Sequence, residues 1–242
     1  MIYISKIRNL KPKRERKAYP YNIKALRNLT ELEFTNPITF IVGENGMGKS
    51  TLVEAIAIQA GFNPEGGSRN FNFETMNSHS ALFEDLKITR TAWRNKDGYF
   101  LRAESFYNVA SEVSRLYGDS GGYLERAYGH SLHHCSHGES FMALLHNRFW
   151  GDGLYILDEP ESALSLSRQM NMMVRFKELL SQKSQFIIAT HSPILLAYPG
   201  AEIWQLDEKG IQKVAYEDTD QFRLTKFFLN NPERILKELD LL

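Results

Sequence analysis

The chain has 242 residues, of which 43% are hydrophobic and 24% are charged, a composition that is ordinary for a globular protein. Lys and Arg (29) balance Asp and Glu (29), so no overall field draws the chain onto nucleic acid or an anionic membrane, and any DNA contact must be local. A single cysteine, Cys135, excludes an internal disulfide, and we find neither an 18-residue apolar run nor a signal-peptide layout. We therefore expect a cytoplasmic protein without a transmembrane segment of its own.

The chain opens with apolar residues that predict short strands, around residues 2–7 and again between 23 and 34. Between them lies the densest basic run, Lys11 to Lys17, with the sequence KPKRERK. Such a run is typical of a solvated loop. The alternative is a loop that contacts the phosphates of a nucleotide or nucleic acid.

A glycine loop follows the apolar run at 38–42 and precedes a segment typical of a helix, from Ser50 to about Ala60. Its sequence, GENGMGKST, matches G-x-x-x-x-G-K-[ST], in which backbone N–H groups and a helix N-terminus face phosphate oxygens. Lys49 would reach the β and γ phosphates, and the Ser50 hydroxyl would ligate Mg²⁺. A chance glycine turn is disfavoured by the flanking strand and helix. The predicted nucleotide-binding residues are Gly43, Glu44, Asn45, Gly46, Met47, Gly48, Lys49, Ser50 and Thr51.

The middle of the chain carries two alternating segments, 86–94 and 99–106, around an Asp97-Gly98 turn signal, which predicts a β-hairpin. Residues 130–140 then hold four of the seven histidines and the cysteine. Because this stretch has no C-x₂-C pair and no second ligand cluster, it favours an anion-binding helix N-terminus over a zinc site.

Two further apolar runs end in polar residues. The run 154–157 leads into Asp158 and Glu159; the first carboxylate would hold Mg²⁺, directly or through water, and the second would polarise the attacking water. The alternative is a strand that ends in solvated acids. The strand at 186–190 ends at His191, at the edge where parallel sheets bind ligands.

The rest of the second half predicts an amphipathic helix whose Met-rich stripe, including Met170, Met173 and Val174, belongs to the core. A closing hairpin is expected at 203–206 and 211–214, followed by helices around 225–229 and 232–241. Without a repeat, linker or composition break, we expect a single domain over residues 1–242.

Taken in order, GENGMGKST, SHGES, LYILDEPE, SALS and ATHS resemble the Walker A, signature, Walker B, D-loop and switch-histidine motifs of ABC-type ATPases. Within that superfamily, the chain looks like the ATPase heads of SMC and RecF proteins and like small stand-alone bacterial ABC-type (AAA family) ATPases. Lys49 and Asp158 are too close in the sequence for the long coiled-coil arm of an SMC head.

The resemblance implies an α/β P-loop NTPase, an ABC-type ATPase head. It would have a mainly parallel core sheet, an N-terminal antiparallel β part and a helical subdomain that carries the signature. Its cofactors would be ATP and Mg²⁺, with Ser50 and Asp158 at the metal. Lys49, Glu159 as general base and His191 at the γ-phosphate would form the catalytic set. Ser136 and Gly138 would contact ATP held by a second subunit, so the complete site would require a head-to-tail homodimer.

Several residues depart from the family pattern. His137 replaces the first glycine of the usual S-G-G signature, and Ser165 stands where the D-loop usually has aspartate. No glutamine occupies the Q-loop position, for which Glu104 and Asn108 are candidates, and no convincing aromatic residue for stacking on adenine is evident.

The leading interpretation is an ATPase whose ATP-dependent dimerisation acts on a partner, an effector protein or DNA, in DNA repair or anti-phage defence. One alternative is the ATP-binding subunit of a membrane transporter, which the absent Q-loop glutamine and stacking aromatic count against. The other is a nucleotide sensor that regulates an associated effector and hardly hydrolyses ATP.

Overall fold

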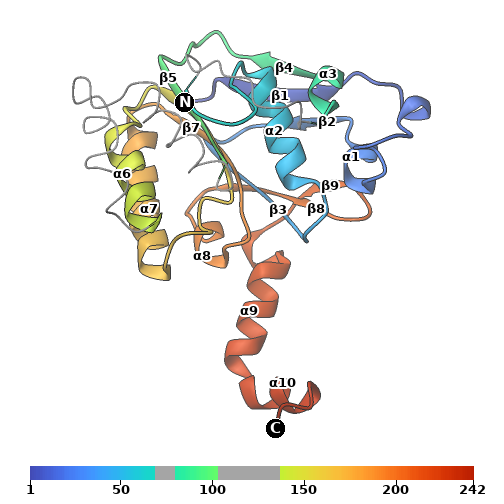
Figure 1. Ribbon diagram of the computed structural model, residues 1–242, viewed down its shortest axis with the longest axis vertical. Helices are drawn as coiled ribbons and strands as arrows, with labels where there is room; N and C mark the ends of the chain where they lie inside the picture. The colour runs from blue at the N-terminus through green and yellow to red at the C-terminus, as the bar shows by residue number, and fades with distance from the viewer. Residues whose placement is uncertain (69–79, 103–136) are drawn as a thin grey trace.

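The structure, a computed structural model, describes residues 1–68, 80–102 and 137–242 (Figure 1). Its centre is a six-stranded sheet with the strand order β5-β6-β7-β3-β8-β9. The strands are β3 (Ile38–Gly43), β5 (Asp97–Arg102), β6 (Gly153–Asp158), β7 (Gln185–Ala189), β8 (Glu202–Leu206) and β9 (Ile211–Lys213). Neighbouring strands are parallel except β8 and β9, which form the predicted closing hairpin. The α/β fold with a mainly parallel core sheet is therefore confirmed.

The central strands are buried on both faces, as parallel strands usually are. Because successive side chains point to opposite faces, Ile41 packs into one core cluster and its neighbours Phe40 and Val42 into the other. Helices on the two faces supply the rest of each core. They are α2 (Lys49–Gln59) on one face, and α6 (His137–Asn147), α7 (Leu166–Ser181) and α8 (Pro193–Leu196) on the other.

A second, three-stranded antiparallel sheet covers the α2 side of the molecule. Its strands, in the order β2-β1-β4, are β1 (Ile4–Asn9), β2 (Glu31–Glu33) and β4 (Leu86–Arg90). They confirm the predicted N-terminal antiparallel part. Short helices join it to the core: η1 (Lys13–Glu15), α1 (Lys24–Asn28) and α3 (Leu82–Asp85). The strand predicted near residues 23–29 is wrong, because this segment is α1, which buries Ala25 and Leu26 on one face.

The predicted hairpin between 86–94 and 99–106 is also wrong. β4 pairs with β1 in the small sheet, whereas β5 runs parallel to β6 in the large one. Asp97 does not make a turn; it begins β5 and accepts hydrogen bonds from Arg148 Nη1 (2.8 Å) and the Tyr155 hydroxyl (2.8 Å). Gly98 allows close packing, because a Cβ there would lie 2.8 Å from Phe62 Cζ. Residues 103–106 lie outside the described residues.

The Met-rich stripe of α7 is core in part. Met172, Phe176 and Leu179 are buried, whereas Met170 (54% exposed) and Val174 (58%) face outward, so their placement in the core was wrong. The two predicted final helices are confirmed as α9 (Asp220–Asn230) and α10 (Pro232–Glu238), after the short helix η3 (Tyr216–Asp218). Among the described helices, none combines the length and apolar character needed to span a bilayer.

Candidate functional site

Three central strands bring the predicted site residues to one edge of the sheet. β6, β7 and β3 are parallel neighbours, so the residues that follow them emerge side by side at their carboxyl ends. Backbone hydrogen bonds join these ends: the Glu159 N–H donates to Ala189 O (2.9 Å), and the Thr190 N–H donates to Ile41 O (3.2 Å). This pairing places the residues after β6 and β7 beside the glycine loop.

The glycine loop, residues 43–48, has the backbone that its sequence predicts. Gly46 (φ +80°) and Gly48 (φ +87°) adopt left-handed conformations, which residues with a Cβ rarely do. Gly48 also lies close to α1, since a Cβ there would come within 2.8 Å of Leu26 Cδ1. The loop leads directly into α2, whose N-terminus therefore faces the same space.

Lys49 is buried at the start of α2, with 4% of its surface exposed. Its ammonium group donates a hydrogen bond to Glu44 O (3.1 Å). Burial lowers the pKa of Lys49, and the negative charges of Glu159, Asp158 and Glu161 oppose that shift. A buried ammonium group offers three hydrogen-bond donors, and the helix N-terminus beside it also favours an anion. Because acids lie nearby as well, the site is suited to an anion that binds together with a metal cation.

Glu159 and His191 lie next to each other across the ends of β6 and β7. Glu159 Oε1 is 3.4 Å from His191 Nε2, and both side chains are partly exposed. Glu159 has a left-handed backbone (φ +50°), a strained conformation for a residue other than glycine and one that clusters at functional sites. Burial and the charge of Lys49 lower the pKa of His191, while Glu159 opposes the shift, so the imidazole is neutral at pH 7.

Glu161 is a residue of this edge that sequence reasoning did not single out. Its Oε1 accepts a hydrogen bond from the backbone N–H of His191 (2.6 Å), which ties the turn after β6 to the residue after β7. Burial raises the pKa of the Glu161 carboxyl. The sequence signal for it was the second glutamate of Asp-Glu-Pro-Glu, which follows Glu159 by two positions.

A cavity of about 280 Å³ lies over the glycine loop. It is lined by Tyr19, Ile23, Asn45, Gly46, Gly48, Lys49, Ser50, Thr51 and Glu159. Most of the predicted phosphate-binding residues therefore border one space. Tyr19, 62% exposed, is the aromatic residue that sequence analysis did not identify; it precedes α1 and lies far from the glycine loop in the sequence. Its ring offers a face on which a nucleotide base can stack.

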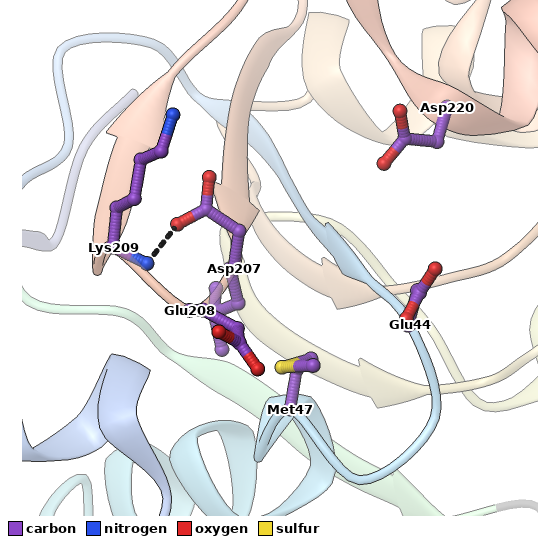
Figure 2. Close-up of a pocket in the computed structure, with 7 residues that line it drawn as sticks. Glu44, Met47, Asp207, Glu208, Lys209 and Asp220 are labelled. Carbon is purple, nitrogen blue, oxygen red and sulfur yellow. Dashed lines mark hydrogen bonds between the residues drawn. The ribbon is translucent and has the colours of Figure 1, made fainter.

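A second cavity of about 250 Å³ borders the glycine loop at Glu44 and Met47 and has a different chemistry. Figure 2 shows it lined by four carboxylates, by Met47 and by one cation, Lys209. The acids come from the loop itself, from the β8–β9 turn and from α9: Glu44, Asp207, Glu208 and Asp220. Asp207 accepts hydrogen bonds within its turn, including one from the Lys209 N–H (2.7 Å; Figure 2). An acidic cleft repels a triphosphate, so the cavity that contains Lys49 is the better candidate for nucleotide.

The donor set beside Lys49 also fits Mg²⁺. Asp158 ends β6 and is 8% exposed, and the Ser50 side chain borders the cavity. Mg²⁺ in proteins commonly takes one or two side-chain oxygens and completes its shell with substrate phosphates and water. No group of three His, Cys, Asp or Glu side chains suited to a metal is found within the described ranges, and the histidine-rich stretch 130–136 lies outside them.

The signature segment is described from residue 137 on. Ser136, like Glu104 and Asn108, lies outside the described residues. Gly138 begins α6, where it packs against the turn after β6: a Cβ on Gly138 would overlap the Arg168 guanidinium and lie 2.8 Å from Ala163 O. In Figure 1, α6 and the glycine-loop helix α2 lie apart. Gly138 is not among the described residues that line the cavity over the glycine loop of its own chain.

The basic run before α1 divides into two groups. Arg16 is 4% exposed and donates to three backbone carbonyls, Lys11 O (2.9 Å), Arg27 O (2.7 Å) and Leu29 O (2.6 Å). Arg16 is therefore a structural residue, and its place in a phosphate-contacting loop was wrong. Lys11 pairs with Asp85 at 3.1 Å. The exposed cations are Lys13, Arg14 and Lys17.

Comparisons with known proteins show which families the chain is similar to. One family model, an AAA domain, matches residues 21–126, and a second, an AAA domain described with the AbiEii toxin of a Type IV TA system, matches residues 139–197. The "Energy-coupling factor transporter ATP-binding protein EcfA2" of Methanospirillum hungatei is 30% identical over 211 residues, or 80% of this chain and 51% of that protein. The chain thus spans about half the length of this curated relative.

Two solved structures were compared with the chain, and the first of them is similar to it in fold. A protein assigned to the metal-chelate type of ABC transporter, in an inward-facing conformation, superposes with a TM-score of 0.52 and 13% identity, over 94% of this chain and 89% of that chain. The SMC head domain from Thermotoga maritima gives a TM-score of 0.47 and 17% identity, over 88% of this chain and 99% of that chain. The motif order, the arrangement of the site and these family matches together show that the chain belongs to the ABC-type ATPase superfamily.

Proposed function

We propose that residues 1–242 act as a single ATPase domain that binds ATP with Mg²⁺ and hydrolyses it to ADP and phosphate. One observation carries the proposal: buried Lys49 and the neighbouring pair of Glu159 and His191 meet at the edge of the sheet that also holds Asp158. The cavity over the glycine loop is the space for the nucleotide. In it, Tyr19 is the candidate to stack on the base.

Each residue has a distinct part in the proposed reaction. Lys49 anchors the β and γ phosphates, and Mg²⁺ held by Ser50 and Asp158 would neutralise phosphate charge. Glu159, as a carboxylate, accepts a proton from the water that attacks the γ-phosphorus, and the bond from that phosphorus to the bridging oxygen breaks. Neutral His191 retains one N–H, which can donate to a γ-phosphate oxygen.

The complete site of the proposed enzyme is formed by two copies in head-to-tail arrangement. Gly138 is not among the described residues that line the cavity of its own chain, which supports a role for Ser136 and Gly138 at the nucleotide of a second copy. In this arrangement two ATP molecules lie in the interface, and ATP binding assembles the dimer.

We propose DNA as the partner on which the ATPase acts. Lys13, Arg14 and Lys17 give a small exposed cationic surface, in which Glu15 pairs with Arg14 at 3.5 Å. Such a surface suits a DNA backbone, and the processes that we propose are repair or anti-phage defence. Charge reversal of these three residues, with Arg16 kept, is expected to abolish retention on DNA–cellulose at low salt. Unchanged retention would remove this loop from the proposal.

The second candidate is a subunit that drives a transporter, and its support is the relative named as an energy-coupling factor transporter ATP-binding protein. A nucleotide sensor that hardly hydrolyses ATP is the third. Steady-state phosphate release separates the sensor from the other two, because a sensor retains ATP without turnover. Co-purification with a membrane protein would favour the transporter.

Calorimetric titration with ATP and Mg²⁺ tests the proposed binding site. Lys49→Ala removes the buried charge beside the phosphates, so we expect no detectable binding. Lys177→Ala is the matched control, since it removes an exposed lysine from α7 that does not line the cavity, and it should leave affinity unchanged. Equal affinity of Lys49→Ala and the wild type would show that nucleotide does not bind in this cavity.

A further inference from the structure

The last two helices carry an apolar surface that the rest of the described chain leaves uncovered. α9 and α10 extend from the body of the molecule (Figure 1), and neither contains a buried residue. We call residues 220–242 the α9–α10 arm. Six of its large apolar side chains are between 43% and 69% exposed: Leu224, Phe227, Phe228, Leu229, Leu239 and Leu241.

The arm is anchored at its base, so its direction is set by the body of the protein. Thr219 caps α9 by accepting a hydrogen bond from the Phe222 N–H (3.3 Å), and the Phe222 ring packs on Tyr216 with centroids 4.7 Å apart. Beyond this first turn, residues 223–230 of α9 are exposed, and the Arg234 guanidinium of α10 lies over the Phe227 ring, 5.9 Å from its centroid. An isolated helix of about this length is marginal in water, because tertiary packing supplies most helical stability. The arm therefore needs a surface against which to pack.

The size of the exposed surface matches one half of a protein interface. Six side chains that each bury roughly 100 Å² would contribute about 600 Å² per copy. A standard stable interface buries about 800 Å² per partner. In an isologous dimer, the same surface of both copies forms the interface. The arm of each copy would then cover the arm of the other, and neither apolar surface would remain exposed.

The charges of the arm favour one kind of partner for its apolar surface. Beyond Asp220 at its base, α9 carries the cations Arg223 and Lys226. The α10 segment, residues 232–240, carries three acids and two cations. The acids are Glu233, Glu238 and Asp240, and the cations are Arg234 and Lys237. Arg223 pairs with Asp218 of η3, and Arg234 pairs with Glu238 within α10. This leaves the positive charge of Lys226 on α9, and on the α10 segment two acids, Glu233 and Asp240, against the one cation Lys237. A two-fold axis that sets α9 of one copy against α10 of the other pairs opposite charges at both contacts.

Over the whole arm, four cations balance four acids, so nucleic acid and an anionic membrane gain no electrostatic attraction. We propose that a second copy of this chain covers the α9–α10 arm, in an isologous dimer that forms without nucleotide. This contact differs from the ATP-dependent contact of the proposed enzyme, and it does not rest on ATP hydrolysis.

Light scattering of the full chain in nucleotide-free buffer with EDTA tests the dimer. We expect twice the chain mass of 27.9 kDa at about 10 μM protein. The double substitution Leu224→Asp and Phe228→Asp should give the monomer mass. Leu166→Asp is the matched control, since Leu166 on α7 is 64% exposed and lies outside the arm, and it should remain dimeric.

Neither substituted arm residue belongs to a core cluster, so we expect the double variant to fold. Its affinity for ATP checks this expectation. The double variant should keep the wild-type affinity for ATP, which separates loss of the dimer from loss of the nucleotide site. A wild-type chain that is monomeric at about 100 μM would overturn the proposal. So would a double variant that remains dimeric, or a wild-type monomer that binds phosphatidylglycerol vesicles through the arm.

Discussion

Arg16 is predicted to stabilise the fold, although it lies in a run of basic residues that resembles a solvated loop. Three hydrogen bonds run from its guanidinium to backbone carbonyls, two of which belong to Arg27, in α1, and Leu29, just after it. α1 in turn contacts the glycine loop, through Leu26 and the position of Gly48. Arg16→Ala would therefore leave the buried Leu29 carbonyl and two partly buried carbonyls without this donor, and it would loosen α1, which lies beside the candidate site.

At roughly 1 kcal/mol net for each bond, Arg16→Ala should lower the free energy of unfolding by about 3 kcal/mol. With a urea m-value of about 3 kcal/mol/M, the midpoint of urea unfolding would fall by about 1 M. Arg14→Ala is the matched control: its side chain is 86% exposed, so we expect a change within about 0.5 kcal/mol. Equal midpoints for the two variants would refute the structural role of Arg16.

Three further predictions concern the candidate site. Gly48→Ala should unfold at a lower denaturant concentration than Gly46→Ala. Both substitutions strain the backbone, but a Cβ at Gly48 also meets Leu26, whereas a Cβ at Gly46 meets nothing within 4 Å. Equal unfolding midpoints would contradict this prediction. The lowered pKa of His191 means that the unfolded chain takes up a proton first as pH falls below 6.5, so the wild type should lose stability there relative to His191→Gln. The raised pKa of Glu161 has the opposite effect, because above pH 4.5 the folded chain holds the proton more tightly than the unfolded chain does. The wild type should therefore lose stability relative to Glu161→Gln as pH rises. For either residue, parallel curves of stability against pH for the variant and the wild type would contradict the prediction.

The candidate site at the edge of the sheet could be predicted from the sequence because its signals are local. The glycine loop, the acids after β6 and His191 after β7 each follow an apolar run that can be buried on both faces in a parallel sheet. Once these runs are neighbours, their carboxyl ends meet, and sequence order is enough to bring Lys49, Glu159 and His191 together.

The features that sequence reasoning missed depend on contacts between distant segments. Asp97 and Gly98 have the composition of a turn, but the contacts of Asp97 with Arg148 and Tyr155 make them the start of a buried strand. Tyr19 reaches the cavity because the segment before α1 lies against the glycine loop. Neither contact leaves a periodic pattern in the sequence, so neither could be predicted from composition or spacing.

The same limit applies to charge. Arg14 and Arg16 are near neighbours in one basic run, yet one is solvated and the other is buried among backbone carbonyls. Local sequence describes their chemistry equally well, and the tertiary position of α1 decides between them.

Glu159→Gln is the substitution that tests the central claim most directly, because it removes the proposed base and keeps the size of the side chain. The measurement is single-turnover quenching of radiolabelled ATP with Mg²⁺, in which bound nucleotide and released phosphate are both counted. We predict that Glu159→Gln binds ATP as the wild type does and retains it uncleaved, while the wild type releases phosphate. Cleavage by Glu159→Gln at the wild-type rate, or a wild type that binds ATP and never cleaves it, would contradict the account.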